Sequence, residues 1–407
     1  MNCRHCGRGL QHVFLDLGNA PPSNAYVSEA GLRAPEVYYP LRLFVCEGCW
    51  LVQTEDYAHA DELFKEDYAY FSSVSRSWVD HAQRFSAMAA ERLRLGAGSL
   101  VLEVAANDGY LLKNFVAAGI PCLGIEPTAS TADAARAIGI PILQEFFGAA
   151  LGSRLAQQGR KADLIVCNNV FAHVPDINDF SAGLRNALKP DGTVTIEFPH
   201  LLRLIEQVQF DTVYHEHFSY LSLHSARSVL AAAGLRVYDV EQLPTHGGSL
   251  RVYACHAGAG LATTQAVERL LAEEEQRGLL RLSTYAAFQP AADAVKDGLL
   301  RFLLESKRDG LRVAGYGAAA KGNTLLNYAG VRPDLLPFIC DAAGSKQGKY
   351  TPGTHIPILH PGELARRRPD VVLILPWNIA PEVMQQQAVV RDWGGRFAVA
   401  VPRVVLS

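Results

Sequence analysis

Residues 207–221 bring together an unusual number of side chains that can exchange protons. Within this stretch, the run Tyr214-His215-Glu216-His217 is followed by further aromatic residues. Such groups suit general acid–base chemistry, because a histidine with its ordinary pKa of roughly 6.5 is mostly neutral at pH 7 and can accept a proton. The stretch follows no clean helix period, which favours a pocket lined by these groups. A solvated strand with polar cross-strand neighbours would carry similar residues, so the run alone does not separate the two interpretations.

Spacing leaves open which histidine would act as a base. Alternate side chains of an extended chain point to the same face. The two histidines would then share one face, with Tyr214 and Glu216 on the opposite one. Both histidines are therefore candidates on spacing alone.

A second chemical pattern lies near the amino terminus, where four of the eight cysteines fall into two CxxC pairs. The pairs are Cys3 with Cys6 and Cys46 with Cys49. In a chain without a secretory signal, this pattern is typical of a zinc site with four thiolate ligands rather than of disulfides. Four protein ligands leave no open coordination position, so we expect a structural zinc that stabilises a small N-terminal unit. Two unrelated redox pairs are the alternative, and His5 or His12 could replace one ligand.

Composition limits the classes of function. The 407 residues exceed one ordinary core and predict two or three domains, and 49% hydrophobic residues are typical of a globular protein. A net charge of −3 argues against a broad nucleic-acid-binding surface, which disfavours a zinc-ribbon adaptor of nucleic acids. The amino terminus shows no apolar signal core, and no stretch is long enough to span a membrane. We therefore expect a cytoplasmic protein that binds neither nucleic acid nor membrane.

The middle of the chain alternates short apolar strands with helices, which predicts a parallel sheet that binds ligands at the carboxyl ends of its strands. The expected strands are residues 99–105, 121–125, 140–143, 162–168 and 193–198. After the second strand, Glu126 is placed to accept the ribose hydroxyls of a nucleoside. The first turn runs from Glu103 to Gly109. Its Asn107 and Asp108 replace a glycine-rich motif, which suits a ligand with a charged amino-acid end better than a pyrophosphate.

Motifs spread along the whole chain occur in a characteristic order. They are Glu-Val-Ala-Ala-Asn-Asp-Gly-Tyr at 103–110, Gly-Ile-Glu-Pro at 124–127, Asn-Asn-Val-Phe-Ala-His-Val-Pro at 168–175, Tyr-His-Glu-His-Phe-Ser-Tyr at 214–220, Thr-His-Gly-Gly-Ser-Leu-Arg at 245–251 and Gly-Tyr-Gly-Ala-Ala-Ala-Lys-Gly-Asn-Thr at 315–324. With these motifs and the cysteine knuckles, the chain resembles the nucleotide-sugar carbon methyltransferases of deoxysugar biosynthesis. Members of that family methylate thymidine-diphosphate 4-keto hexoses at carbon 3. The resemblance covers essentially the entire chain.

The resemblance implies a class I domain that binds S-adenosylmethionine (SAM) in the middle of the chain. Its cofactor-binding residues would be Glu103, Asn107, Asp108, Gly109, Glu126, Asn168 and Asn169. It also implies that His217 is the base that removes the hydrogen from carbon 3, which the neighbouring ketone acidifies by taking the charge onto its oxygen. The other residues of that site would be Glu216, Tyr214, His173 and Tyr68, with Tyr70 and His215 on the sugar. His173 would either polarise the keto oxygen or cap a helix.

The last third of the chain contains a second strand–turn–helix motif. A Gly-x-Gly-x-x-Ala run at 315–320 follows a strand, and Asp341 lies some twenty residues on, which matches a dinucleotide fingerprint. An NAD-dependent sugar dehydrogenase would be the direct interpretation. A methyl-transfer reaction, however, requires no hydride transfer. The same helix terminus can hold the diphosphate of a nucleotide sugar, and a purely structural Rossmann-like unit is the third interpretation.

Two glycine turns supply the remaining candidates for binding the substrate. They are Gly317, Lys321 and Asn323 in the last third, and His246, Gly247, Ser249 and Arg251 in the middle domain. The backbone of the second turn, freed by its glycines, would bind an anion or would simply connect two strands.

Together these patterns predict an α/β protein in three parts. The parts are a small zinc-binding unit at 1–75, a Rossmann-like class I SAM methyltransferase domain at 76–260, and connecting helices with a second Rossmann-like domain at 261–407. We expect a monomeric C-methyltransferase whose partner is a dTDP-linked keto sugar and whose cofactors are SAM and structural Zn²⁺. Methylation of oxygen or nitrogen is the nearest alternative, because the pose of the substrate alone separates it from carbon methylation.

Overall fold

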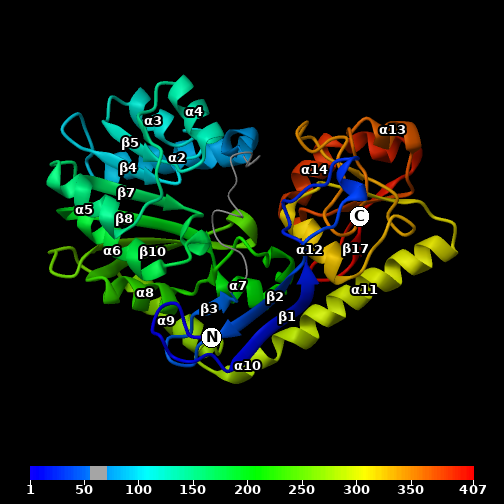
Figure 1. Cartoon of the computed structure of the whole chain (residues 1–407), viewed down its shortest axis with the longest axis horizontal. Helices are drawn as coiled ribbons and strands as arrows, with labels where there is room; N and C mark the ends of the chain where they lie inside the picture. The colour runs from blue at the N-terminus through cyan, green and yellow to red at the C-terminus, as the bar shows by residue number, and fades with distance from the viewer. Residues whose placement is uncertain (56–70) are drawn as a thin grey trace.

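The computed structural model describes residues 1–55 and 71–407 of the chain. Figure 1 shows two α/β bodies, one from the middle of the chain (cyan to green) and one from its last third (orange to red), with N-terminal strands and helix α11 along their base. Strand β1 (His12–Ala20) packs against α11 (Phe288–Arg308) and against α12 (Ala320–Tyr328) of the second body. The N-terminal strands therefore lie against both the connecting helices and the C-terminal body.

The central sheet has the strand order β10-β11-β8-β7-β4-β5-β6. Its strands are β4 Val101–Val104, β5 Cys122–Ile125, β6 Ile142–Leu143, β7 Ala162–Asn168, β8 Leu188–Pro199, β10 Leu235–Leu243 and β11 Ser249–His256. Strands β4 to β8 pair in parallel, whereas β11 runs antiparallel to both β8 and β10. Each strand expected from the sequence is present, and the predicted Rossmann-like sheet is confirmed.

Helices lie on both faces of this sheet (Figure 1). They are α2 Arg76–Arg92, α3 Leu112–Ala117, α4 Ala129–Ala137, α5 Ala149–Gln157, α6 Ile177–Ala187 and α8 Leu223–Ala232. Helix α7 (Leu201–Glu206) instead buries its leucines in the apolar cluster of the N-terminal strands. Helix α2 shows how the sequence sets the packing, because Trp78, Ala82 and Phe85 recur at helical spacing and are buried in one apolar cluster with the sheet. The helix begins after Ser75, whose hydroxyl accepts a hydrogen bond from the N–H of Trp78.

A smaller antiparallel sheet carries the N-terminal unit. Its order is β1-β2-β3-β9, with β2 Tyr39–Val45, β3 Val52–Thr54 and β9 Ser219–Tyr220. Strand β9 comes from the middle of the chain and pairs through Tyr220 with Val52. The segment that carries the Tyr-His-Glu-His run is therefore attached directly to the N-terminal unit.

The C-terminal body contains a sheet of order β14-β13-β12-β15-β16-β17. Its strands are β12 Val313–Tyr316, β13 Ile339–Cys340, β14 Ile358–Leu359, β15 Val371–Ile374, β16 Arg396–Val399 and β17 Val405–Leu406. The pairs are parallel except for β16 with β17. The helices of this part, besides α11 and α12, are α9 Gln265–Gln276, α10 Leu282–Ala286, α13 Glu363–Arg367 and α14 Ala380–Gln386. The second Rossmann-like unit is thus present.

One apolar cluster crosses all three parts of the chain. It includes Phe14 and Leu43 from the N-terminal sheet, Leu201 from α7, Phe288 from α11 and Leu373 from β15. The rings of Phe14 and Phe288 stack with their centroids 4.6 Å apart. Because close-packed interiors deform little, a shared core fixes the positions of side chains from different parts relative to one another.

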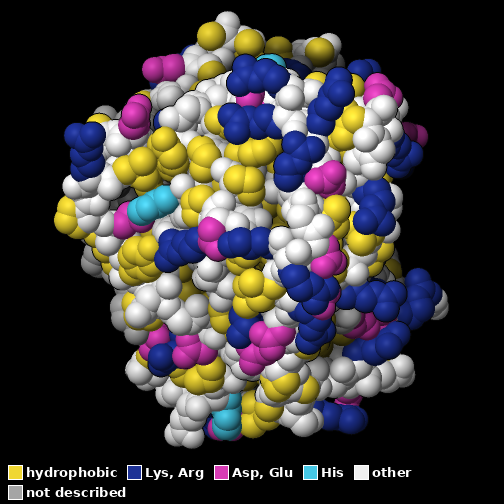
Figure 2. Space-filling view, turned by 90° about the vertical axis from the view of Figure 1, so that its right-hand side faces the viewer, with side chains coloured by type: hydrophobic (Ala, Val, Ile, Leu, Met, Phe, Trp, Pro, Cys, Tyr) yellow, Lys and Arg dark blue, Asp and Glu magenta, His cyan; other side chains and the backbone are white. Residues whose placement is uncertain are grey.

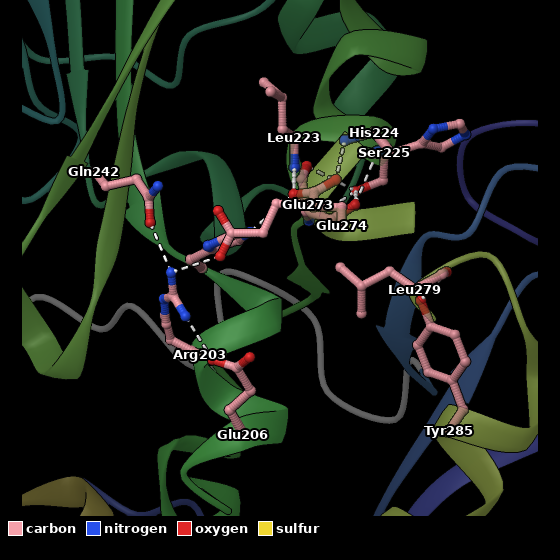
Figure 3. Close-up of polar contacts among 12 residues, drawn as sticks. Arg203, Glu206, Leu223, His224, Ser225, Gln242, Glu273, Glu274, Leu279 and Tyr285 are labelled. Atoms are coloured by element: carbon pink, nitrogen blue, oxygen red, sulfur yellow. Dashed lines mark hydrogen bonds and ion pairs between the residues drawn. The ribbon is translucent and has the colours of Figure 1, made fainter. Parts of the chain in front are cut away.

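A buried carboxylate joins helix α9 to the central body (Figure 3). Glu274 accepts hydrogen bonds from the backbone N–H groups of Leu223 (2.6 Å) and His224 (2.9 Å) at the start of α8. A negative charge at this end of a helix is stabilised by the unpaired N–H groups and by the helix dipole. Beside it, Arg203 of α7 donates to the carboxylate of Glu273 at 3.0 Å. The connecting helix therefore also holds the amino end of α8 in place.

The outer face of the C-terminal body shows Lys and Arg side chains with Asp and Glu between them (Figure 2). Ion pairs of this part include Arg367 with Glu363 at 2.8 Å and Lys307 with Asp334 at 2.9 Å. Within the described ranges, no helix is both long and apolar enough to cross a bilayer.

Candidate active site

His217 lies in a cluster of rings. Its centroid is 4.0 Å from that of Tyr214 and 4.6 Å from that of His173, whose plane is inclined by 69°. His173 ends the short helical turn that follows β7, whereas the other two residues lie just before β9. The structure therefore brings these three predicted site residues together from separate segments.

A backbone carbonyl fixes the tautomer of His217. Its Nδ1 lies 3.0 Å from the carbonyl oxygen of Thr212. Since a carbonyl can only accept, Nδ1 carries the hydrogen of the neutral ring and Nε2 keeps the lone pair. Burial, followed by the charge of His173, holds the pKa of His217 well below its usual value. The ring is therefore neutral at pH 7 and able to accept a proton at Nε2.

His173 is held in the same way. Its Nδ1 lies 2.8 Å from the carbonyl oxygen of Glu216, so this nitrogen donates and Nε2 carries the lone pair. Burial lowers the pKa of His173 to about 4. The two imidazoles thus pack edge to face as neutral rings, each tied to the backbone through Nδ1.

The Tyr-His-Glu-His run is not an extended strand. The N–H of His217 donates to the carbonyl of Tyr214 at 2.9 Å and closes a turn. The turn places Tyr214 beside His217 and directs His215 toward β2, where its Nε2 lies 3.3 Å from the carbonyl oxygen of Tyr39. The expectation that both histidines share one face is therefore wrong, because the backbone turns between them.

Glu216 is held by the N-terminal unit. Its side chain is 3% exposed, and Oε1 accepts a hydrogen bond of 2.8 Å from Nδ2 of Asn24. Its backbone carbonyl meanwhile binds His173. This residue therefore connects the N-terminal unit to the pair of histidines.

The carboxyl end of β4 forms a tight polar turn. Ala105, Asn107 and Gly109 have φ values of 58°, 50° and 78°, the left-handed region that strains side chains other than glycine. The N–H of Asn107 donates to one oxygen of Glu126, and the N–H of Thr128 donates to the other, both at 2.9 Å. Two backbone bonds thus set the Glu126 carboxylate at the end of β5.

Several buried polar atoms at this edge have no hydrogen-bond partner among the residues that the structure describes. They are Oε2 of Glu103, Oδ1 of Asp108, both side-chain polar atoms of Asn168, and Oδ1 of Asn169. Buried polar groups are normally hydrogen-bonded, so this clustering at the ends of β4 and β7 indicates a polar ligand. Burial, with the nearby charges of Glu126 and Asp108, raises the pKa of Glu103 well above its usual value. The donors, acceptors and negative charge fit the amino-acid end, ribose and sulfonium of SAM.

The turn between β10 and β11 joins this edge to the C-terminal body. His246 has a φ of 54°, and its Nε2 lies 3.1 Å from Nδ2 of Asn169. Burial lowers the pKa of His246 to about 4. At Gly247, with a φ of 90°, a Cβ atom would lie 2.5 Å from the ring of Trp377. The hydroxyl of Ser249 donates to the backbone carbonyl of Thr245 in the same turn at 2.9 Å.

Arg251 lies in a buried ionic network. It is 4% exposed, with its guanidinium 2.7 Å from Glu197 and 3.1 Å from Glu241. His81 lies 2.9 Å from the same Glu197 carboxylate.

The C-terminal body contributes a cation. Nζ of Lys321 donates to Oδ1 of Asn378 in the same body and lies 4.6 Å from the ring centroid of Trp377. Burial lowers the pKa of this lysine. Its charge in turn lowers the pKa values of His217 and His246, so it lies within electrostatic reach of both rings.

The glycine turn after β12 is closely packed. Gly317 has a φ of 84°, and a Cβ atom there would lie 2.5 Å from Pro376. The carbonyl of Ala318 accepts hydrogen bonds from the hydroxyl of Tyr26 (2.6 Å) and from Nζ of Lys346 (2.9 Å). Side chains of the N-terminal unit and of the loop after β13 thus lie against this turn.

Helix α12 is also bonded to the other parts of the chain. Asn323 is fully buried, and its amide donates to the carbonyl of Ser23 at 2.7 Å. The hydroxyl of Thr324 donates to the carbonyl of Val213 at 2.8 Å. Of the predicted residues in this body, Lys321 is the one whose charge reaches His217.

The four cysteines of the two knuckles gather at one point. The sulfurs of Cys3, Cys6, Cys46 and Cys49 all lie within 4.8 Å of one another, with 3.5 Å between Cys3 and Cys49 and between Cys6 and Cys46. A disulfide would require about 2.05 Å. Thiolates at ~2.3 Å from a tetrahedral zinc lie about 3.8 Å apart, so the cluster fits a four-thiolate zinc site.

The neighbouring histidines have other partners. Nδ1 of His5 lies 2.8 Å from Oδ1 of Asn178, and Nε2 of His12 lies 3.3 Å from the carboxylate of Glu47. The sulfur cluster includes neither ring.

Two predicted residues, Tyr68 and Tyr70, lie outside the described part of the chain. Sequence patterns also missed contacts near His217 that depend on tertiary structure. These are the carbonyl that orients His217, the bond from Trp377 to Asp211, and the contacts of Arg4. Asp211 lies inside the 207–221 stretch, and that is the signal that could have pointed to it.

Comparisons with known proteins give matches over all three parts. Family models described as "Putative zinc binding domain", "Methyltransferase domain" and "C-methyltransferase C-terminal domain" match residues 3–64, 79–240 and 244–402. The C-methyltransferase NovU of Streptomyces niveus is 35% identical over 400 residues, which cover 98% of this chain and 95% of NovU.

Two solved methyltransferase structures are similar to part of the chain. A 1,6-didemethyltoxoflavin-N1-methyltransferase of Burkholderia thailandensis, solved with S-adenosylhomocysteine, is 18% identical at a TM-score of 0.38 and covers 51% of this chain and 95% of that one. The magnesium protoporphyrin IX methyltransferase of Synechocystis PCC 6803 is 15% identical at a TM-score of 0.36 and covers 44% of this chain and 83% of that one.

Proposed function

This chain belongs to the C-methyltransferase family that joins a zinc-binding domain to a SAM-dependent methyltransferase domain, and on that premise we propose that it methylates carbon 3 of a dTDP-linked 4-keto deoxyhexose. The reaction runs through an enolate that His217 generates. The observation that carries this proposal is the hydrogen bond from Nδ1 of His217 to Thr212, which leaves Nε2 as the proton acceptor.

The ketone at carbon 4 makes the hydrogen on carbon 3 acidic. Nε2 of His217 takes that proton, and the electron pair of the C–H bond moves into an enolate whose charge rests largely on the keto oxygen. SAM, when bound, supplies an electrophilic methyl group. The burial of His217 supports this role, since a ring that stays neutral at pH 7 is ready to accept a proton.

Tyr214 is proposed as the donor to the enolate oxygen. A neutral His173 has its one N–H engaged by the Glu216 carbonyl and cannot donate through Nε2. His173 is therefore assigned to fixing the His217 ring, against which it packs edge-on. Glu216 supports the same loop through Asn24. Tyr68 is assigned to the site from the family resemblance.

The cofactor site is proposed at the carboxyl edge of the central sheet. Glu103, Asp108, Asn168 and Asn169 would use their unpaired polar atoms there, with Asn107, Gly109 and Glu126 shaping the turn beside them. Negative groups at this edge favour a sulfonium, which carries positive charge. The zinc is proposed as structural, because its four thiolates leave no open position.

The nucleotide-sugar site is proposed between this edge and the C-terminal body. Lys321 is the strongest candidate for the anionic part of the substrate, because it lies within electrostatic reach of His217 and His246. The remaining proposed contacts are Tyr70, His215, His246, Gly247, Ser249, Arg251, Gly317 and Asn323. We further propose that the chain works as a cytoplasmic monomer with domain boundaries after residues 75 and 260.

Hydrogen exchange at carbon 3 tests the proposal. The protein is incubated in D₂O with a dTDP-4-keto-6-deoxyhexose and S-adenosylhomocysteine, and the sugar is followed by proton NMR. We expect the carbon 3 signal to disappear and the other ring signals to stay. The proposal would be overturned if no exchange occurred at carbon 3. It would also be overturned if a transferred ¹³C-methyl group had the chemical shift of an O- or N-methyl group.

A further inference from the structure

The first cysteine knuckle encloses two residues that reach out of the metal unit. The N–H of Arg4 donates to Oε1 of Gln53 on β3 at 2.9 Å. Nδ2 of Asn178, on α6, donates to the carbonyls of Arg4 and His5 at 3.2 and 2.9 Å. The knuckle is therefore held between the N-terminal sheet and a helix of the central body.

The guanidinium of this arginine contacts both loops that carry the paired histidines. Its Nη1 donates to the carbonyl of Pro175 at 2.7 Å, and its Nη2 donates to the carbonyl of Thr54 at 3.2 Å. Its central carbon lies 5.4 Å from the ring centroid of Phe218. Pro175 lies two residues after His173, and Phe218 directly follows His217. One side chain between two metal ligands therefore touches both segments.

Thr54 completes the connection. Its N–H donates to the carbonyl of Phe218 at 3.2 Å, and its hydroxyl donates to the carbonyl of His217 at 3.3 Å. The N–H of Phe218 in turn donates to the carbonyl of Ala172 at 2.8 Å. The two histidine loops are thus bonded to each other and to β3, and Arg4 spans all three.

We propose that Arg4 is a positioning residue for the base, so that zinc binding by the flanking cysteines sets the orientation of His217 against His173. The inference rests on the proposed role of His217. A planar guanidinium suits this task, because its fixed fork donates to two carbonyls at once. A purely architectural arginine would affect stability alone, whereas a positioning residue also changes proton abstraction and its pH dependence.

The test compares Arg4→Ala with Arg8→Ala in the full-length, zinc-loaded protein. Arg8 lies two residues after the same knuckle but pairs with the exposed Glu47 at 3.3 Å, which makes it a matched control. Arg4→Ala is expected to retain zinc and SAM affinity, measured by metal analysis and calorimetry. Its deuterium exchange at carbon 3 and its kcat should fall roughly ten- to a hundred-fold, since small displacements of reacting groups have effects of this size.

The pH profile separates positioning from stability. Burial, His173, His246 and Lys321 lower the pKa of the His217 ring, whereas the hydrogen bond to the Thr212 carbonyl raises it. In Arg4→Ala the His217 ring is no longer held in place, so its pKa should lie closer to the usual value for histidine. The acid limb of the exchange rate, the fall in rate at low pH, should therefore move to higher pH. Arg8→Ala should keep the acid limb and the exchange rate of the wild-type protein.

Each outcome bears on the proposal. An Arg4→Ala protein with wild-type exchange and an unmoved acid limb would overturn the proposal. An Arg4→Lys protein that behaves like wild type would also overturn it, because the proposal requires the planar fork of the guanidinium and not the positive charge alone. If Arg4→Ala fails to fold, Thr54→Val, which removes the hydroxyl bond to the His217 carbonyl, must shift the limb in the same direction. Wild-type protein without any exchange overturns the proposed function instead.

Discussion

The indole Nε1 of Trp377 donates a hydrogen bond of 2.7 Å to Oδ2 of Asp211. Trp377 belongs to the C-terminal body, whereas Asp211 directly precedes Thr212, whose carbonyl orients His217. Burial raises the pKa of the Asp211 carboxyl to about 6, although Lys321 and the indole act in the opposite direction. The C-terminal body therefore contacts the segment that orients His217.

Trp377→Phe should destabilise the protein more at pH 8 than at pH 5. The raised pKa means that Asp211 contributes to stability fully below its ordinary value of 3.8, and that this contribution is lost as pH rises through about 6. Removing the indole donor leaves the charged carboxylate without that bond, at a cost of about 1–3 kcal/mol. Urea unfolding at the two pH values measures the difference.

A matched tryptophan provides the control for this experiment. Nε1 of Trp393 donates to the carbonyl of Pro369 at 2.9 Å, with no carboxylate involved. Trp393→Phe should therefore destabilise equally at both pH values. If the loss in the free energy of unfolding were independent of pH in Trp377→Phe as well, the role given to Asp211 would be contradicted.

His217→Asn should abolish methyl transfer while leaving the affinity for SAM within about two-fold. The amide lacks a basic nitrogen, whereas the cofactor edge is formed by Asp108, Asn168 and other residues of the central sheet. Calorimetry measures the affinity, and transfer of a labelled methyl group measures the rate. His224→Asn on α8 is the control and should keep wild-type activity. Comparable turnover in both variants would remove His217 from the role of base.

The acid limb of kcat/KM should lie below pH 6.5. A base must be unprotonated, so activity is lost as pH falls through its pKa, and burial together with His173 and Lys321 places that pKa below the usual value for His217. Rates measured from pH 5 to 8 at low substrate concentration give the midpoint. Far-UV circular dichroism over the same range must stay constant. A midpoint above 6.5 in folded protein would contradict the assignment.

Chelation should inactivate the protein slowly. Three of the four cysteines of the sulfur cluster are buried, so release of zinc requires opening of the N-terminal unit. Activity should fall with the rate of zinc release, followed with a chromophoric chelator, and should return when zinc is added back under reducing conditions. An immediate loss on mixing would instead indicate a zinc that takes part in the chemistry.

Local patterns in the sequence were sufficient to predict the strands and the residues that follow them. Glu126 and Asn168 follow or end apolar strands, and the parallel arrangement then requires them to lie at one edge of the sheet. The cysteine knuckles were predictable for a similar reason, because their short spacing by itself brings two ligands together.

Contacts between distant segments could not be predicted in this way. The partners of Arg4, Trp377 and Asp211 are set by how whole bodies pack, and no periodicity records them. The orientation of His215 was misjudged because a turn closed by His217 and Tyr214 replaces an extended backbone. A two-residue strand such as β9 is also too short to show an alternating pattern.

The pairing of β9 with β3 has a consequence for biosynthesis. The ribosome has made more than half of the 407 residues before Ser219 and Tyr220 can close the sheet begun by the first fifty. Until then, the edge of β3 stays open while the nascent chain grows, in a cell where domains usually fold in order of synthesis. Because Cys46 and Cys49 lie between β2 and β3, early metal capture by the cysteines would hold this hairpin to the first knuckle during that interval.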